Sequence, residues 1–173
     1  PYKAKTPKAT IKKGLGLIPE DRRGQGLLLE KNVKENTSLA SLFANSNHGF
    51  INFGWEKQES VSYIEKLRIK TPSELALLKN LSGGNQQKVV IAKWLLAKSR
   101  ILIMDEPTRG IDVAAKVEIY NLMNELKQQG IAVMFVSSEM PEVMGIADRI
   151  IVMCDGRITG ELAAEEATQN QIL

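Results

Sequence analysis

Three short apolar runs divide the second half of the chain, and polar or turn residues border each of them. The runs cover residues 101–104, 131–137 and 149–154. Continuous apolar runs, in place of alternating ones, are typical of parallel strands that are covered on both faces. Helical patterns lie between the runs, over about 113–129 and near 141–147. This alternation of strand and helix predicts a parallel α/β sheet.

The first half of the chain predicts one short strand followed mainly by helices. Residues 14–19 form an apolar strand that a proline ends, and the charged, glycine-containing residues 20–26 follow as a loop. Asn32 is placed to cap a helix over residues 33–42. The other elements expected here are a loop with anchoring aromatics over 45–54 and a helix over 56–69 that ends at Thr71-Pro72.

A helix that follows Gly84 has almost no polar face. Its residues 89–97 are almost all apolar, so we expect it to be buried on most sides. Near the end of the chain, Asp155-Gly156 predicts a tight turn that forms a hairpin with residues 157–160. The chain therefore divides into a mostly helical front and an α/β back.

The composition fits one domain with an aliphatic core. The 173 residues are 43% hydrophobic but only 5% aromatic. The net charge of +3 is modest, and basic residues gather at the amino end, where we expect a solvated strand or linker. A nucleic-acid-binding protein needs a basic stripe with stacking aromatics, so nucleic acid is a minor alternative. The basic cluster consists of Lys3, Lys5, Lys8, Lys12 and Lys13.

Cysteine use and hydropathy bear on the compartment. The single cysteine, Cys154, has no partner within the chain, and we expect a buried structural thiol in a reducing cytoplasm. No apolar run approaches the length that spans a bilayer, and no signal peptide opens the sequence. We therefore expect a soluble protein that docks, if at all, onto a membrane partner.

Ser82-Gly83-Gly84 opens the apolar helix and has the chemistry of an anion cradle. The first N–H groups of a helix have no internal partner and carry the positive end of its dipole. Glycines let that backbone approach a phosphate, and the Ser82 hydroxyl adds a donor. The alternative is that Ser82 is an ordinary helix cap and the glycines belong to a loop.

Asp105 and Glu106 end the first of the three apolar runs. Ligands of open parallel sheets lie beyond the carboxyl ends of the strands, so both carboxylates are well placed. We expect Asp105 to bind Mg²⁺, directly or through water, and Glu106 to orient and deprotonate an attacking water. The alternative is a solvated acidic pair before the turn at Pro107.

Four segments together resemble the ATP-binding cassette (ABC) ATPases, and in particular the second cassette of the tandem ATPases of bacterial ribose-, xylose- and galactose-type importers. The segments are Pro19-Glu20-Asp21-Arg22, residues 81–88, residues 105–112 and Ser137-Ser138-Glu139-Met140-Pro141-Glu142. The resemblance implies a partial ABC-type nucleotide-binding domain, a parallel sheet flanked by helices, with a mostly helical subdomain. No G-x-x-x-x-G-K-[ST] phosphate loop occurs in the 173 residues, so we expect a piece that begins after that loop.

The resemblance also implies roles for single residues. Ser82, Gly83, Gly84 and Gln86 form the signature motif, which covers ATP held by another cassette. Asp112, which is also placed to cap the next helix, belongs to the D-loop. Two positions depart from the family pattern: Glu20 stands where the Q-loop glutamine is usual and joins Asp105 as a candidate metal ligand, and Ser138 stands at the switch-histidine position. His48, in a loop far upstream, cannot fill that role, so we expect the site containing Glu106 to be slow or impaired.

The resemblance divides the chain into three parts: 1–13 as the truncated end of a linker or strand, 14–80 as the Q-loop region and permease-facing helical subdomain, and 81–173 as the signature helix, Walker B and α/β part. Leu27, Leu28 and Leu29 form either a groove for the permease or simply core.

The expected function is that of a fragment of the ATP-hydrolysing subunit of a sugar importer, inactive in isolation. The cofactors implied are ATP and Mg²⁺. The partners implied are another cassette, membrane permease subunits and, indirectly, a periplasmic sugar-binding protein, at the cytoplasmic face of the bacterial inner membrane. Two alternatives stay open: a non-transport ABC ATPase that acts on DNA or ribosomes, and a non-catalytic protein-binding module.

Overall fold

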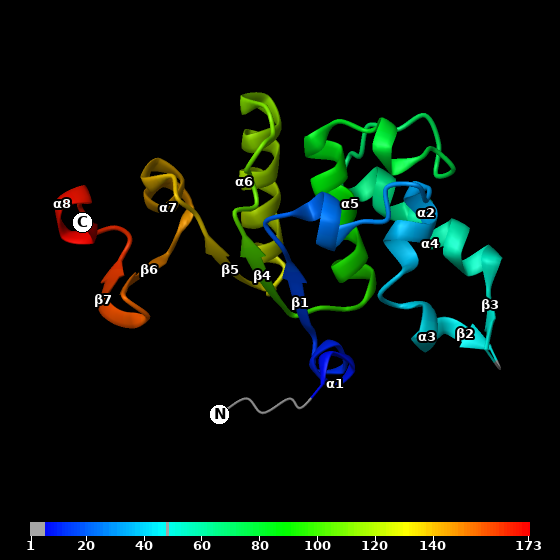
Figure 1. Ribbon diagram of the computed structural model, residues 1–173, viewed down its shortest axis with the longest axis horizontal. Helices are drawn as coiled ribbons and strands as arrows, with labels where there is room; N and C mark the ends of the chain where they lie inside the picture. The colour runs from blue at the N-terminus through cyan, green and yellow to red at the C-terminus, as the bar shows by residue number, and fades with distance from the viewer. Residues whose placement is uncertain (1–5, 48) are drawn as a thin grey trace. The chain divides into compact units, whose positions relative to one another are not determined.

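The computed structural model describes residues 6–47 and 49–173 (Figure 1). It divides into two compact units, Pro1–Val136 and Ser137–Leu173, which are described separately. The boundary expected between residues 80 and 81 lies inside the first unit. The expectations for His48, Lys3 and Lys5 fall on residues that lie outside the described part of the chain.

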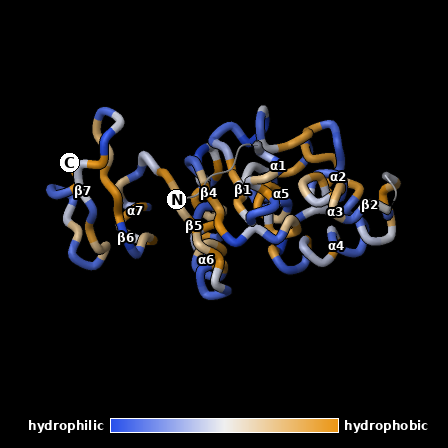
Figure 2. The backbone as a smooth tube through the Cα atoms, turned by 90° about the horizontal axis from the view of Figure 1, so that it is seen from below, coloured by the Kyte–Doolittle hydropathy of each residue, from blue (hydrophilic) through white to orange (hydrophobic). Residues whose placement is uncertain are grey.

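The first unit is built on a three-stranded parallel sheet. Strand β4 (Ile101–Asp105) lies at the centre between β1 (Leu15–Ile18) and β5 (Ala132–Val136). These strands form an apolar block in Figure 2. The parallel sheet expected from the apolar runs is therefore confirmed.

The third expected strand does not join this sheet. Strand β6 (Arg149–Cys154) pairs antiparallel with β7 (Arg157–Ala163) in the second unit. The cause is the turn: Asp155 and Gly156 have φ of 48° and 75°, the left-handed pair that a two-residue hairpin needs. The hairpin was expected, and because β6 is one arm of it, Cys154 lies beside the turn and is exposed. The prediction of a buried thiol was wrong.

Helices cover the sheet unequally. Helix α5 (Gly83–Leu96) packs against β1, and α6 (Val113–Gln128) packs against β5. Alternate residues that face this side, such as Leu102 and Met104, are fully buried. On the opposite side, Leu17 and Met134 are 52% and 53% exposed, so the expectation of strands covered on both faces does not hold within the described chain.

Helix α5 is the buried helix that the apolar pattern predicted, with ten of its residues buried. It contacts α2 (Val33–Ser38), which in turn packs on α4 (Phe53–Lys66). Asn32 begins α2 through a capping box: its Oδ1 accepts from the Glu35 amide at 2.8 Å. Between α2 and α4, the buried Glu56 accepts from Ser38 Oγ at 2.7 Å and pairs with Lys34 at 3.1 Å.

Two segments differ from expectation. Residues 45–54 contain a small hairpin and the start of α4. Their phenylalanines are not buried anchors: Phe50 and Phe53 are 79% and 68% exposed, although the Lys34 ammonium lies 5.6 Å from the centre of the Phe53 ring. At the amino end the expected strand or linker contains helix α1 (Pro7–Lys12), because Thr6 caps it and proline occupies its first turn. The remaining short elements are the helical turns η1 (Arg22–Gly26) and η2 (Leu78–Asn80), α3 (Leu42–Asn45), β2 (Ser46–Asn47), β3 (Phe50–Ile51), α7 (Met140–Ile146) and α8 (Gln169–Ile172).

Candidate functional site

Ser82 precedes α5 with an extended backbone and an exposed side chain. Its Oγ accepts a hydrogen bond from Asn85 Nδ2 at 2.9 Å, and its carbonyl oxygen accepts from the Gln86 amide. Ser82 is therefore the residue at which the helix begins, as either reading of the sequence required. Its hydroxyl stands at the exposed start of a 14-residue helix, and such a helix end favours an anion.

The two glycines of the motif have a second reason to be glycine. A Cβ built on Gly83 would lie 2.7 Å from Nη2 of Arg22, and one built on Gly84 would lie 2.5 Å from the Cβ of Ala115 in α6. Side chains at these positions would collide with the neighbouring segments of the same chain. Close packing inside the protein requires these glycines whether or not a phosphate approaches them.

Gln86 lies inside the protein. Its side chain is fully buried, and its Nε2 donates to the carbonyl oxygens of Leu78 and Leu81 at 3.0 and 3.1 Å. Its Oε1 accepts from Nε of Arg23 at 3.2 Å. The side chain thus holds the turn before α5 in place, and the structure does not bring it to the surface where a nucleotide would lie.

Asp105 and Glu106 lie at the carboxyl end of β4, the centre of the sheet, and both are partly exposed. The Glu106 amide donates to the carbonyl oxygen of Val136, the last residue of β5, at 2.9 Å. Glu106 has φ of 44°, a left-handed conformation that is uncommon for a non-glycine residue and collects at functional sites. The backbone turns sharply there, so the two neighbouring carboxylates leave the strand differently.

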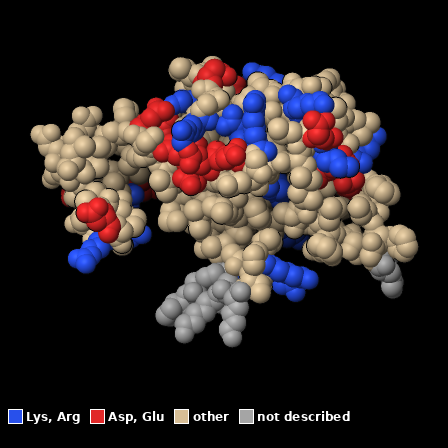
Figure 3. All heavy atoms as spheres, in the orientation of Figure 1, with Lys and Arg blue, Asp and Glu red and all other residues tan. Residues whose placement is uncertain are grey.

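Glu20 follows β1 closely and so belongs to the same edge of the sheet. Its carboxylate forms an ion pair with Arg109, in the loop after β4. Within residues 6–47 and 49–173, no group of three His, Cys, Asp or Glu side chains is placed to hold a metal ion. Mg²⁺ commonly binds through one or two carboxylates with substrate phosphates and water, and Asp105 fits that manner of binding. Figure 3 shows acidic and basic side chains gathered at this edge.

The capping role that the sequence predicted for Asp112 is confirmed. Asp112 caps α6, where its Oδ1 accepts from the Ala115 amide at 2.9 Å. Ser138 lies exposed in the second unit. Beside it, Ser137 Oγ donates to Oε2 of Glu142 at 2.7 Å, which fixes the turn into α7.

Sequence reasoning missed the contacts of two cations, Arg22 and Lys93. Arg22 donates to the carbonyl oxygens of Arg109 and Gly110 at 2.8 and 3.2 Å. Lys93, on α5, is only 7% exposed, and its Nζ donates to the Gly26 carbonyl oxygen at 2.6 Å. Burial lowers the pKa of Lys93 from 10.5 to about 8. A single lysine within an otherwise apolar helical run was the available signal for Lys93. Arg22 belongs to the segment Pro19-Glu20-Asp21-Arg22 that carried the resemblance, but the sequence did not show which backbone its side chain contacts.

Leu27 and Leu28, two of the residues offered as a groove or as core, differ from each other. Leu27 is 6% exposed and belongs to the core, whereas Leu28 is 47% exposed.

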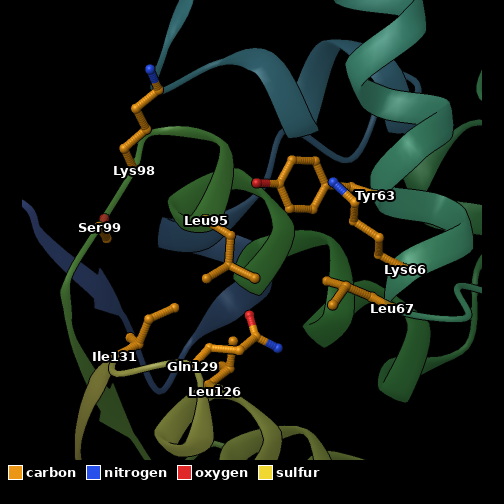
Figure 4. A pocket seen from close by; sticks show the side chains of 9 residues that line it. All are labelled: Tyr63, Lys66, Leu67, Leu95, Lys98, Ser99, Leu126, Gln129 and Ile131. Atoms are coloured by element: carbon orange, nitrogen blue, oxygen red, sulfur yellow. The ribbon is translucent and has the colours of Figure 1, made fainter.

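A cavity of about 340 Å³ lies elsewhere, between α4, the end of α5 and the end of α6 (Figure 4). None of the expected site residues lines it. Its lining residues are Tyr63, Lys66, Leu67, Leu95, Lys98, Ser99, Leu126, Gln129 and Ile131. Within the described chain, no helix is long and apolar enough to cross a membrane.

Comparison with known proteins identifies the family. Residues 3–109 match the family model described as ABC transporter. The xylose import ATP-binding protein XylG of Moorella thermoacetica is 52% identical over 171 residues, and the ribose import ATP-binding protein RbsA of Bacillus subtilis is 52% identical over 169. These alignments cover 99% and 98% of this chain but 34% of each relative, so the chain spans about a third of their length.

Solved structures show the same fold. The ADP conformation of the ATP-binding cassette MJ1267 matches with a TM-score of 0.76 and 25% identity, over 97% of this chain and 68% of that one. The dimeric cassette MJ0796, bound to ADP and Pi, matches with a TM-score of 0.74 at 21% identity, over 91% and 66%. With a matching family model over most of its length and half of its residues shared with import ATP-binding proteins, the chain belongs to the ABC transporter family and has the α/β fold of its ATPase cassettes.

Proposed function

We propose that this chain is part of the ATP-hydrolysing subunit of a bacterial monosaccharide importer. It supplies the signature motif, Walker B and D-loop to an ATP site built head to tail with another cassette. The names of the relatives, ribose and xylose import ATP-binding proteins, support the substrate class. The observation that carries the proposal is the pairing of an exposed Ser82 at a long helix's amino end with Asp105-Glu106 at the central strand's carboxyl end.

The residues divide the work by their chemistry. Ser82 Oγ and the first amides of α5 bind phosphate oxygens, because those donors have no helical partner and carry the positive end of the helix dipole. Asp105 holds Mg²⁺ together with phosphate oxygens; when bound, the ion neutralises charge on the phosphates. Glu106 orients a water molecule and accepts its proton, a role that contributes about 10²–10⁴-fold to such reactions. Gln86 acts indirectly, by holding the turn before α5.

The two sets of residues serve different ATP molecules in this proposal. The signature turn completes a site whose phosphate loop belongs to the other cassette, and Glu106 serves the site on its own side. Because Ser138 stands at the switch position, the site of Glu106 is the weaker one. The proposed partners are the other cassette and permease subunits at the cytoplasmic face of the membrane, with a periplasmic sugar-binding protein acting indirectly.

Two substitutions in the protein as the cell makes it test this division, with transport and ATP hydrolysis as readouts. Ser82→Arg should abolish both, because it places a cation and a long side chain at the head-to-tail site. Glu106→Gln should reduce them less. Gln128→Arg, at an exposed residue at the carboxyl end of α6 and outside the subdomain assigned to the permease, is the control and should leave both unchanged. Equal loss of ATP hydrolysis in Ser82→Arg and Glu106→Gln would contradict the division of roles.

A calorimetric titration of this 173-residue chain with MgATP tests the head-to-tail arrangement directly. No phosphate loop occurs in the sequence, so we expect no binding up to millimolar nucleotide. Micromolar binding would mean that the chain builds a nucleotide site by itself. The roles given to Ser82, Asp105 and Glu106 would then be wrong.

A further inference from the structure

The side chain of Arg22 lies where three segments meet that are far apart in the sequence. From η1, its Nη1 donates to the carbonyl oxygen of Arg109 at 2.8 Å, and its Nη2 donates to that of Gly110 at 3.2 Å. The same Nη2 would lie 2.7 Å from a Cβ on Gly83, so it packs directly on the backbone at the start of α5. One guanidinium thus contacts both the loop after β4 and the first turn of α5.

The turn that carries Arg22 is itself fixed to α5. Arg23 donates to Gln86, and the Gly26 carbonyl oxygen accepts from Lys93 at 2.6 Å. On its other side, Glu20 pairs with the side chain of Arg109. Because these contacts hold both ends of η1, the backbone of Arg22 has a defined position. The two hydrogen bonds of its side chain therefore fix the carbonyl oxygens of residues 109 and 110.

We propose that Arg22 is a positioning residue that fixes the loop of residues 108–112 to the amino end of α5. The proposal rests on the function proposed above, in which that loop and the Ser82 turn face the same partner cassette. Held by one guanidinium, the two segments keep a constant spacing and reach the partner as one surface. In this proposal Arg22 acts through these two segments, so it is a positioning residue and not a catalytic one.

The geometry requires arginine in particular. The planar guanidinium presents donors in a fixed fork, which suits two neighbouring carbonyl oxygens, whereas a lysine ammonium is a point charge on a flexible stem. Gly83 lacks a side chain at the place where the guanidinium packs, and Gly110 has φ of 68°, which turns its carbonyl group in a way that favours glycine. Both glycines are therefore part of the same contact.

Hydrogen–deuterium exchange tests the link without any need for ATP hydrolysis. We would compare the natural protein, in the length in which the cell makes it, with Arg22→Gln and Arg22→Lys. Amides of residues 108–112 and 83–86 should exchange about tenfold faster or more in Arg22→Gln, because two charge-assisted hydrogen bonds are lost. Arg22→Lys should show an intermediate effect at 108–112. Arg149→Gln, which breaks an exposed pair with Glu161, is the control and should leave both segments unchanged.

Kinetics of ATP hydrolysis give the second readout. Arg22→Gln should lower kcat by a larger factor than it raises the KM for ATP, because the two segments lose their fixed spacing while the phosphate-binding groups at the start of α5 stay in the chain. If Arg22→Gln does not fold by circular dichroism, the exchange of Arg22→Lys decides. Unchanged exchange at residues 108–112 in a folded variant would overturn the proposal. Faster exchange in a protein that hydrolyses no ATP even with Arg22 intact would support the link and contradict only the proposed function.

Discussion

Lys93 places a cation within the buried face of α5. Burying the charged ammonium costs free energy, and this cost makes the stability of the protein depend on pH. The side chain is 7% exposed, and burial lowers the pKa of its ammonium from 10.5 to about 8. Unfolding restores the ordinary pKa. Between these two values the unfolded chain binds a proton that the folded protein has lost, so the free energy of unfolding rises as pH rises through this window.

The size of the effect follows from the two pKa values. At pH 7 the buried charge costs about 3 kcal/mol, and between pH 7 and pH 9.5 about 2 kcal/mol of that cost disappears. Lys93→Met removes the charge and keeps a side chain of similar length, but it leaves the Gly26 carbonyl oxygen without its 2.6 Å partner. That loss costs about 1–3 kcal/mol, so near pH 7 the two changes almost cancel and the variant is about as stable as the natural protein.

Urea unfolding followed by tryptophan fluorescence, at several values from pH 7 to pH 9.5, measures the slope. The protein with Lys93 should gain about 2 kcal/mol of unfolding free energy relative to Lys93→Met over this range. Lys98→Met, at an exposed position close to the end of the same helix, is the control and should keep the slope. The range stops below pH 10 because burial raises the pKa of Tyr63, and stability is lost above that point as the unfolded tyrosine ionises. Identical slopes with and without Lys93 would refute the reasoning.

Two further substitutions test packing and charge. Gly84→Ala should cost about 1–3 kcal/mol, because its Cβ would lie 2.5 Å from that of Ala115; Gly145→Ala, where nothing in the described chain outside its own helical turn lies within 4 Å, is the control. Equal shifts of the thermal midpoint would contradict this. Lys34→Met should cost roughly 3 kcal/mol in urea unfolding, because it leaves the buried Glu56 without the ammonium at 3.1 Å. Adding Glu56→Leu should recover most of that loss, and a double variant no more stable than the single one would show that the pair is not its cause.

The sequence predicted the elements that depend on local pattern. The capped helix at Asn32, the apolar helix α5 and the strands β1, β4 and β5 follow from spacing that is visible in a single segment. Strand pairing is not local. Strand β6 looked like a further parallel strand, but the turn at Asp155-Gly156 commits it to an antiparallel neighbour, and the exposure of Cys154 follows from that pairing.

The candidate site was predicted in part. The motif containing Ser82 and the pair Asp105-Glu106 could be recognised from the sequence. Ser82 directly precedes an apolar helix and the two carboxylates directly follow an apolar strand, and both positions favour ligand binding. The contacts of Arg22, and the burial of Gln86, could not be recognised. They depend on which distant backbone lies opposite a side chain, and only the folded chain determines that.

The pairing of β1 with β4 has a consequence for the order of folding. Leu15 lies opposite Ile101, and Ile101 lies opposite Ala132, so the first pairing closes a loop nearly three times as long as the second. The longer closure costs about 0.9 kcal/mol more in chain entropy. We therefore expect β4, α6 and β5 to form the folding nucleus and β1 to dock after the rate-limiting barrier. The kinetic φ-value is the fraction of a mutation's effect on stability that already appears in the folding rate, and it should be near one half in the nucleus and near zero in β1.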